Sequence, residues 1–373
     1  MAVISEKKLL FGVFISFFTV SSANAIQLPE ERADASYHSY SGGGVDVSGP
    51  ALLVRKNIEQ TYSITAGFHI DDITNASVDA VTQASAYTEQ RTEINTGFDY
   101  QIDDAIISLS WIASDENDYE SSLYGFSIAQ EVFGGMTVIS LGYARGFDNV
   151  GRIDTEFDEE IDRHQFKASW KQILSPRWVL NTQYELMDDQ GYLANPYRAA
   201  LQNCAFGDQI VCAAVPEVYP ETRTSHAISF TNLYYLGNDS VFRSDYRFFT
   251  DTWAIDAHEF EASLSTQMIN NFTLEASYRF YTQSAANFYF DNATQDTNFI
   301  SRDKELSQFI GHSIGFDIEY ELLAPEEYDI DSLTLGVSYD FVFHDYDNFT
   351  DIRTGVLYTL EATVLQVFLS AVF

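Results

Sequence analysis

The sequence predicts an all-β fold, a transmembrane antiparallel β-barrel of about 14 to 16 strands. Hydrophobic residues make up 46% of the 373 residues. No segment after the first 25 residues is apolar over the ~20 residues that a spanning helix needs. Alternating segments of about ten residues recur along the chain instead, joined by connections that are short and long by turns. A soluble β-sandwich, the alternative, has no reason to sort its connections in this way.

The first 25 residues have the pattern of a secretory signal peptide that is removed on export. Lys7 and Lys8 precede an apolar run over 9–18, and Ala23-Asn24-Ala25 forms a small-x-small cleavage site. A membrane anchor is the alternative, but the apolar run is shorter than a spanning helix. We expect 26–44 to be a short polar periplasmic segment and 45–373 to form the barrel. Residues 45–56 could supply one or two short strands.

Period-two alternation predicts fourteen strands, and a hairpin in the early segment would raise the number to sixteen. We expect the short Gly, Asn, Asp and Pro connections on the periplasmic side and the long acidic connections on the extracellular side. The predicted strands are 63–70, 91–100, 105–113, 123–133, 136–143, 164–174, 178–186, 225–236, 241–253, 257–269, 272–283, 306–322, 333–343 and 363–373.

The last predicted strand has one wholly apolar face. Its backbone donors and acceptors need a neighbour, and pairing with the first strand would close the barrel. The alternation assigns one set of side chains to lipid, with Phe373 at a membrane interface, and another to the lumen. The lipid set is Leu365, Val367, Leu369 and Phe373, and the lumenal set is Gln366 and Ser370.

The charge and the cysteines limit the partners. The formal net charge of −35 repels nucleic acid, so we exclude that class of partner. Cys204 and Cys212 enclose seven residues, and in an exported protein they are expected to form a disulfide across one loop. A metal or redox pair is the weaker alternative. The pattern predicts no cofactor, because no Gly-rich phosphate loop and no Cys/His set at metal-ligand spacing is present.

A second group of residues is predicted to line the lumen, because an arginine in lipid would cost about 2 to 4 kcal/mol at the midplane. These charges could pair across strands and stiffen the barrel, or the basic ones could form a stripe that selects solutes in a water-filled pore. The predicted lumenal residues are Lys167, Lys171, Glu185, Arg243, Asp245, Arg247, Glu259, Glu261, Glu275 and Arg279.

No pattern in the sequence predicts an enzyme. Ser225 and His226 are adjacent and fall on opposite faces of a regular strand, so they cannot form a dyad. Asp251 and His258 bracket an outer loop and could meet at the rim as an acid–base pair. No nucleophile or oxyanion partner accompanies them.

Five segments resemble an uncharacterised proteobacterial outer-membrane family, domain of unknown function 3570. They are GPALLVRK at 49–56, NPYR at 195–198, RFFTDTW at 247–253, RFYTQSAANFY at 279–289 and SRDKELS at 301–307. The resemblance implies a location in the outer membrane of a Gram-negative bacterium. It implies no substrate or activity. Residues in these motifs could converge at the extracellular rim, or form salt bridges and loop anchors there: Arg198, Asp251, Trp253, Tyr281, Arg302, Asp303 and Lys304.

The function that these observations favour is passive passage of small solutes or ions through a polar lumen, with no substrate identified. Residues 26–44 are too few to fold into a plug domain. The alternative is a binding or scaffold barrel that holds a ligand, a metal ion or a partner protein at its extracellular rim. The expected environment is outer-membrane lipid and lipopolysaccharide.

Overall fold

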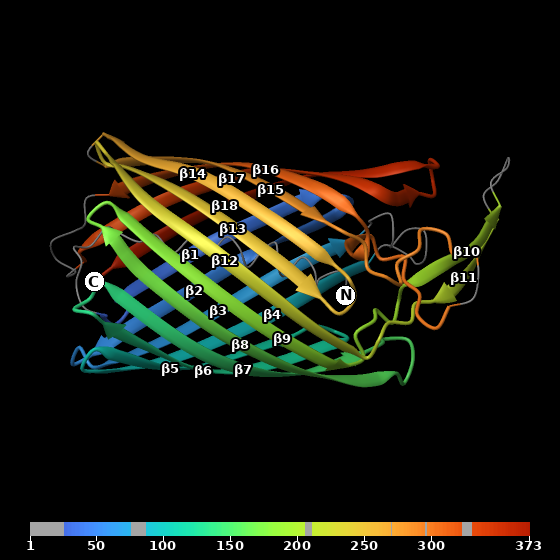
Figure 1. Ribbon diagram of the computed structural model, residues 1–373, viewed down its shortest axis with the longest axis horizontal. Helices are drawn as coiled ribbons and strands as arrows, with labels where there is room; N and C mark the ends of the chain where they lie inside the picture. The colour runs from blue at the N-terminus through green and yellow to red at the C-terminus, as the bar shows by residue number, and fades with distance from the viewer. Residues whose placement is uncertain (1–25, 76–86, 206–210, 270, 295–296, 323–329) are drawn as a thin grey trace.

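The chain folds as a closed antiparallel barrel of sixteen strands (Figure 1). The computed structural model describes residues 26–75, 87–205, 211–269, 271–294, 297–322 and 330–373. The barrel strands are β1 (Arg32–Gly42), β2 (Val45–Ile58), β3 (Tyr62–Asn75), β4 (Tyr87–Ile102), β5 (Ala105–Asp115), β6 (Tyr119–Val132), β7 (Thr137–Gly151), β8 (Asp158–Ser175), β9 (Trp178–Gly191), β12 (Thr222–Gly237), β13 (Ser240–Asp251), β14 (Asp256–Ile269), β15 (Phe272–Gln283), β16 (Phe309–Leu322), β17 (Ser332–Asp351) and β18 (Val356–Val372).

In the described part of the chain, a hairpin and a 3₁₀ turn lie outside the barrel wall. Strands β10 (Ala199–Ala205) and β11 (Val211–Pro216) form a separate hairpin that projects beyond one end of the barrel (Figure 1). A single 3₁₀ turn, η2 (Lys304–Leu306), precedes β16. Within the part of the chain that the structure describes, no helix has the length and apolar character to cross a membrane.

The first and last strands close the barrel, as the alternation at the end of the sequence predicts. β1 pairs with β18 from Arg32 opposite Val372 to Gly42 opposite Ala362, and with β2 on its other side. All fourteen predicted strands are present, and β1 and β2 are the additional hairpin. The expected polar segment 26–44 is therefore wrong in its boundary, because the barrel begins at β1. Tyr37 is the one large apolar side chain on the outward face of β1, so hydrophobic alternation did not reveal this strand.

The two ends of the barrel differ in their connections. We call the end where β1 begins and β18 finishes the terminal end, and the opposite end the loop end. Connections at the terminal end are short except for 323–331, and the long connections 192–221 and 284–308 lie at the loop end. Some loop-end connections are also short, such as 43–44 and 252–255, which the prediction of long outer loops missed. The acidic segment between the predicted strands 136–143 and 164–174, expected to be a long connection, is mostly strand. β7 continues to Gly151 and β8 begins at Asp158.

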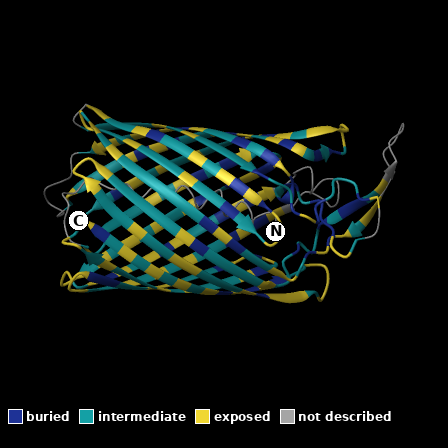
Figure 2. Cartoon of the chain, viewed as in Figure 1, coloured by how far each residue is buried: buried dark blue, intermediate teal, exposed yellow. Residues whose placement is uncertain are grey.

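More exposed and less exposed residues alternate along the strands (Figure 2), as expected where side chains point in turn to the outer surface and to the lumen. Leu365, Val367 and Leu369 in β18, and Phe373 just after it, are 40 to 45% exposed on the outer surface, whereas Ser370 is buried. This confirms the face assignment of the closing strand. An outward apolar band with a polar interior is the arrangement that lets a barrel lie in a bilayer.

Four tyrosine–histidine pairs lie on the outer surface toward the loop end. In each pair a tyrosine hydroxyl is hydrogen-bonded to the Nδ1 atom of a histidine on the strand that follows across a loop-end connection, at 2.7 to 2.9 Å. Amphipathic rings of this kind are enriched at membrane–water interfaces. The pairs therefore indicate the edge of the apolar band that is nearer the loop end. They are Tyr143–His164, Tyr184–His226, Tyr246–His258 and Tyr278–His312.

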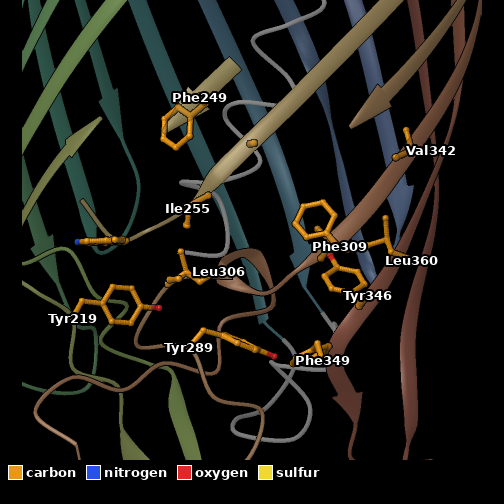
Figure 3. Close-up of a cluster of buried hydrophobic side chains, with 14 of the residues drawn as sticks. Tyr219, Phe249, Ile255, Tyr289, Leu306, Phe309, Val342, Tyr346, Phe349 and Leu360 are labelled. Atoms are coloured by element: carbon orange, nitrogen blue, oxygen red, sulfur yellow. The ribbon is translucent and has the colours of Figure 1, made fainter. Parts of the chain in front are cut away.

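A cluster of buried apolar side chains fills one side of the mouth at the loop end (Figure 3). The connection 284–308 contributes Tyr289 and Leu306, which belong to one buried cluster with lumenal side chains of the strands such as Phe309, Tyr346 and Leu360. The connection before β12 adds Tyr219. Its ring packs edge to face against that of Trp253, with the ring centroids 5.6 Å apart. We call the connections 192–221 and 284–308 together the cap. Burial of this cluster holds the cap against the barrel wall.

Candidate functional site

The predicted lumenal residues all lie on the inner face of the barrel. Each alternates with outward apolar neighbours, as Arg243 and Asp245 do with exposed Phe242 and Tyr246. The structure places on this face Lys167, Lys171, Glu185, Arg243, Asp245, Arg247, Glu259, Glu261, Glu275 and Arg279.

The lumenal cations are held by neighbouring carboxylates. Arg243 Nε lies 2.6 Å from Asp245. Glu185 binds two cations from different strands, Arg247 at 2.9 Å and Lys167 at 3.5 Å. A further ion pair joins Arg279 on β15 to Glu259 on β14. These four cations form cross-strand or same-strand pairs, so they do not present an unpaired basic stripe to solvent.

The lumenal carboxylates outnumber these cations on one wall of the barrel. Five carboxylates on β14 to β17 face the lumen and make no ion pair with any residue that the structure describes. Glu275 of β15 lies directly opposite Asp317 of β16 in the strand register. The surplus charge of this wall is therefore negative, and it is carried by Glu261, Glu275, Asp317, Glu319 and Asp340.

The predicted rim residues come together in part within the cap. Arg198, from the connection before β10, forms an ion pair with Asp303. Asp303 also caps η2, because its Oδ1 accepts a hydrogen bond from the backbone N–H of Glu305 at 3.0 Å. Arg302 is buried, and its guanidinium lies 2.9 Å from Asp291 and 4.5 Å above the ring of Phe349. Lys304, in η2, is buried as well.

The other predicted rim residues anchor the barrel edge. Asp251 binds the Arg223 guanidinium at 2.6 Å and accepts the backbone N–H groups of Trp253 and Ile255, each at 2.9 Å. The Tyr281 hydroxyl donates to the Gln283 side chain at 2.8 Å. Asp251 faces inward at the end of β13, whereas His258 faces outward in its pair with Tyr246. The acid–base pair suggested for Asp251 and His258 is therefore wrong, because the two side chains lie on opposite faces.

Glu217 joins the two connections of the cap, a role that sequence patterns did not indicate. Its Oε1 accepts the backbone N–H of Arg302 at 2.6 Å, and its Oε2 accepts the Tyr219 hydroxyl at 2.7 Å. Burial, followed by the nearby Asp303 carboxylate, raises the pKa of Glu217 to about 7. The Ser301 hydroxyl donates to the Tyr219 oxygen at 3.0 Å and extends the network. No motif marks Glu217, since Arg302, the partner that links it to the other connection, lies 85 residues away in the sequence.

Among the residues that the structure describes, two groups of side chains have ligand atoms close enough to hold a metal ion. His38, His69 and Asp71 form the first, on the lumenal faces of β1 and β3. The second is purely acidic and combines Glu89 of β4 with Glu116 and Asp118 in the turn after β5. Sequence reasoning found no metal set because the first group joins two strands separated by a third. The one available signal is the His-x-Asp spacing at 69–71, which places both side chains on one strand face.

The expected disulfide lies outside the described residues, because the side chains of Cys204 and Cys212 are not described. Their backbones occupy the two strands of the β10–β11 hairpin. The disulfide thus stays a prediction, and so does the signal peptide over 1–25. Mass spectrometry after maleimide treatment, with and without prior reduction, would reveal two labelled thiols only in the reduced sample.

Comparisons with known proteins agree with this architecture. A model of the family described as "Protein of unknown function (DUF3570)" matches residues 78–339. No curated protein matches the sequence. A bacterial polysaccharide outer membrane secretin has a solved structure similar to this chain, with a TM-score of 0.50 and 9% identity over 93% of this chain and 100% of that chain.

Other solved outer-membrane barrels align over similar lengths. The outer membrane protein opdK from Pseudomonas aeruginosa has a TM-score of 0.45 and 9% identity over 93% of this chain and 100% of that chain. OmpT of Vibrio cholerae has a TM-score of 0.41 and 8% identity over 96% of this chain and 100% of that chain. At such identities, the likeness concerns the fold alone. That fold is the one found in Gram-negative outer-membrane proteins.

Proposed function

The chain belongs to the DUF3570 family, and we propose that it is an outer-membrane channel for passive passage of small cations through its lumen. The observation that carries this proposal is the surplus of lumenal carboxylates on β14 to β17. A ring or wall of acidic side chains in a water-filled pore attracts cations and repels anions. The paired arginines add little net field, because each lies beside a carboxylate.

The register concentrates this negative field at one level of the wall. Glu275 and Asp317 face each other on neighbouring strands, and the Ser338 hydroxyl on β17 donates to Asp317. Two carboxylates directly opposite each other repel. Such an arrangement destabilises the wall unless cations or water occupy the space beside it. Glu275 and Asp317 are therefore the residues that favour cation entry.

Planar-bilayer recording tests the proposal directly. The purified chain should conduct, and its reversal potential in a KCl gradient should indicate cation preference. The double variant Glu275→Gln/Asp317→Asn should move the reversal potential toward zero. Asp256→Asn, which removes an exposed carboxylate on the outer side of β14, should leave it unchanged. A barrel without conductance, or one that prefers anions, would refute the proposal.

The second candidate is a binding or scaffold barrel, and the contacts between described residues of the cap favour it. Residues from 192–221 and 284–308 hold each other at the mouth through Glu217, Arg302 and the Arg198–Asp303 ion pair. A cap with this many specific contacts offers a surface for a ligand or protein. This candidate predicts a barrel that does not conduct and that co-purifies with a partner. Deletion of the β10–β11 hairpin should then abolish co-purification of the partner.

A further inference from the structure

Three potential metal ligands converge on the lumenal wall between β1 and β3. The Nε2 atom of His38 lies 2.8 Å from Asp71 Oδ1, and the Nε2 atom of His69 lies 2.9 Å from the same oxygen. The candidate ligand atoms all lie within 4.8 Å of one another. The two imidazole rings meet edge to face, with centroids 4.9 Å apart. Two nitrogen atoms and one oxygen atom thus point toward one small region.

The intervening strand leaves room for this convergence. His38 is opposite Gly49 of β2 in the strand register, and β3 follows on the far side of β2. A Cβ atom at Gly49 would lie 1.8 Å from the Ile70 carbonyl oxygen, so only glycine fits. Because no side chain rises from Gly49, the His38 ring can lie across β2 and reach Asp71.

Arg91 orients the carboxylate of this group. It lies opposite Asp71 in the register between β3 and β4, and its guanidinium pairs with Asp71 Oδ2. The other oxygen, Oδ1, is thereby directed to the two imidazoles. His69 Nε2 lies 2.9 Å from the same Oδ1 that His38 Nε2 approaches, so two imidazole nitrogens face one carboxylate oxygen. One ion placed between these three atoms would contact all of them.

We propose that His38, His69 and Asp71 bind a divalent transition-metal ion such as Zn²⁺ on the lumenal wall. Two neutral imidazole nitrogens and one carboxylate form a common ligand set for such ions. Bonds of about 2.1 Å to one ion separate its ligand atoms by about 3.0 to 3.4 Å, so each nitrogen–oxygen distance must lengthen by well under 1 Å. Arg91 then acts as an outer partner that holds the ligating carboxylate.

Metal titration of the purified, folded barrel tests the site. After treatment with EDTA, the chain should bind one Zn²⁺ in isothermal titration calorimetry, and Co²⁺ should give the visible absorption of a nitrogen-containing site. The variants His38→Ala and His69→Ala should each weaken Zn²⁺ binding at least tenfold. His344→Ala, which removes another lumenal histidine, should bind as the wild type does. Retention of wild-type binding in the His38→Ala/His69→Ala double variant would overturn the proposal.

A conservative variant separates a metal ligand from a structural contact. His69→Gln keeps a side-chain nitrogen that can hydrogen-bond to Asp71, and it removes the imidazole ligand. Heat-modifiable migration in gels should show a folded barrel, while Co²⁺ absorption is lost. Unchanged Co²⁺ absorption in this variant would refute a role of His69 as a ligand.

Excess Ca²⁺ distinguishes this site from the acidic group at Glu89, because Ca²⁺ prefers oxygen ligands. Ca²⁺ should not displace Co²⁺, and displacement would assign the ion to the acidic group instead. The titration needs no conductance, so its outcome is independent of the proposed channel.

Discussion

Ionisation of Glu217 should loosen the cap as the pH rises. In the closed cap the pKa of Glu217 is about 7, against an ordinary value of 4.5, because the carboxyl is buried and faces Asp303. Arg198 partly offsets these effects, and the Tyr219 hydroxyl and the Arg302 N–H bind the carboxylate. A raised folded-state pKa means that the stabilisation is fully present below pH 4.5 and is lost as the pH rises to about 7.

The magnitude follows from the two pKa values of Glu217. One pH unit corresponds to about 1.4 kcal/mol, so full ionisation should cost the closed cap roughly 3 kcal/mol. Between pH 5.5 and 8, the ratio of closed to open cap should fall about 25-fold.

Hydrogen exchange at the Arg302 amide reports this change, since that N–H donates to Glu217. After correction for the intrinsic exchange rate, protection at Arg302 should fall over this pH range in the wild type. It should stay constant in Glu217→Gln, which keeps an acceptor oxygen and cannot ionise. Glu221→Gln alters an exposed carboxyl in the same connection and should behave as the wild type does. Equal Arg302 protection at pH 5.5 and pH 8 in the wild type would refute the reasoning.

Two further predictions concern the barrel wall. Phe260→Arg places a charge on the outward face of β14 and should cost about 2 to 4 kcal/mol in urea unfolding from lipid vesicles, whereas Glu261→Arg on the lumenal face should cost less than about 1 kcal/mol. Similar costs for both would contradict the face assignment. In Gly336→Ala, the added methyl would lie 2.1 Å from the Phe368 ring, so unfolding free energy should fall by about 1 to 2 kcal/mol. The same change should cost less in a Phe368→Ala background, and equal costs would show that the ring is not the obstacle.

The sequence alone determined the barrel class, fourteen of the strands and the lipid and lumenal faces. Strand geometry explains this success, because side chains alternate with a period of two and arginine is costly in lipid. Leu365 and Gln366 could therefore be assigned to opposite faces from their neighbours in sequence. Strand β1 was not predicted, because only Tyr37 gives its outward face a large apolar side chain.

Only the tertiary structure decided which lumenal and loop residues meet. The contact between His38 and Asp71 depends on the register of three strands and on the missing side chain at Gly49. The contact between Glu217 and Arg302 depends on how two long connections pack at the mouth. Alternation fixes the face of a residue but not its height or its neighbour on another strand, because register and loop packing are set by the closed barrel as a whole.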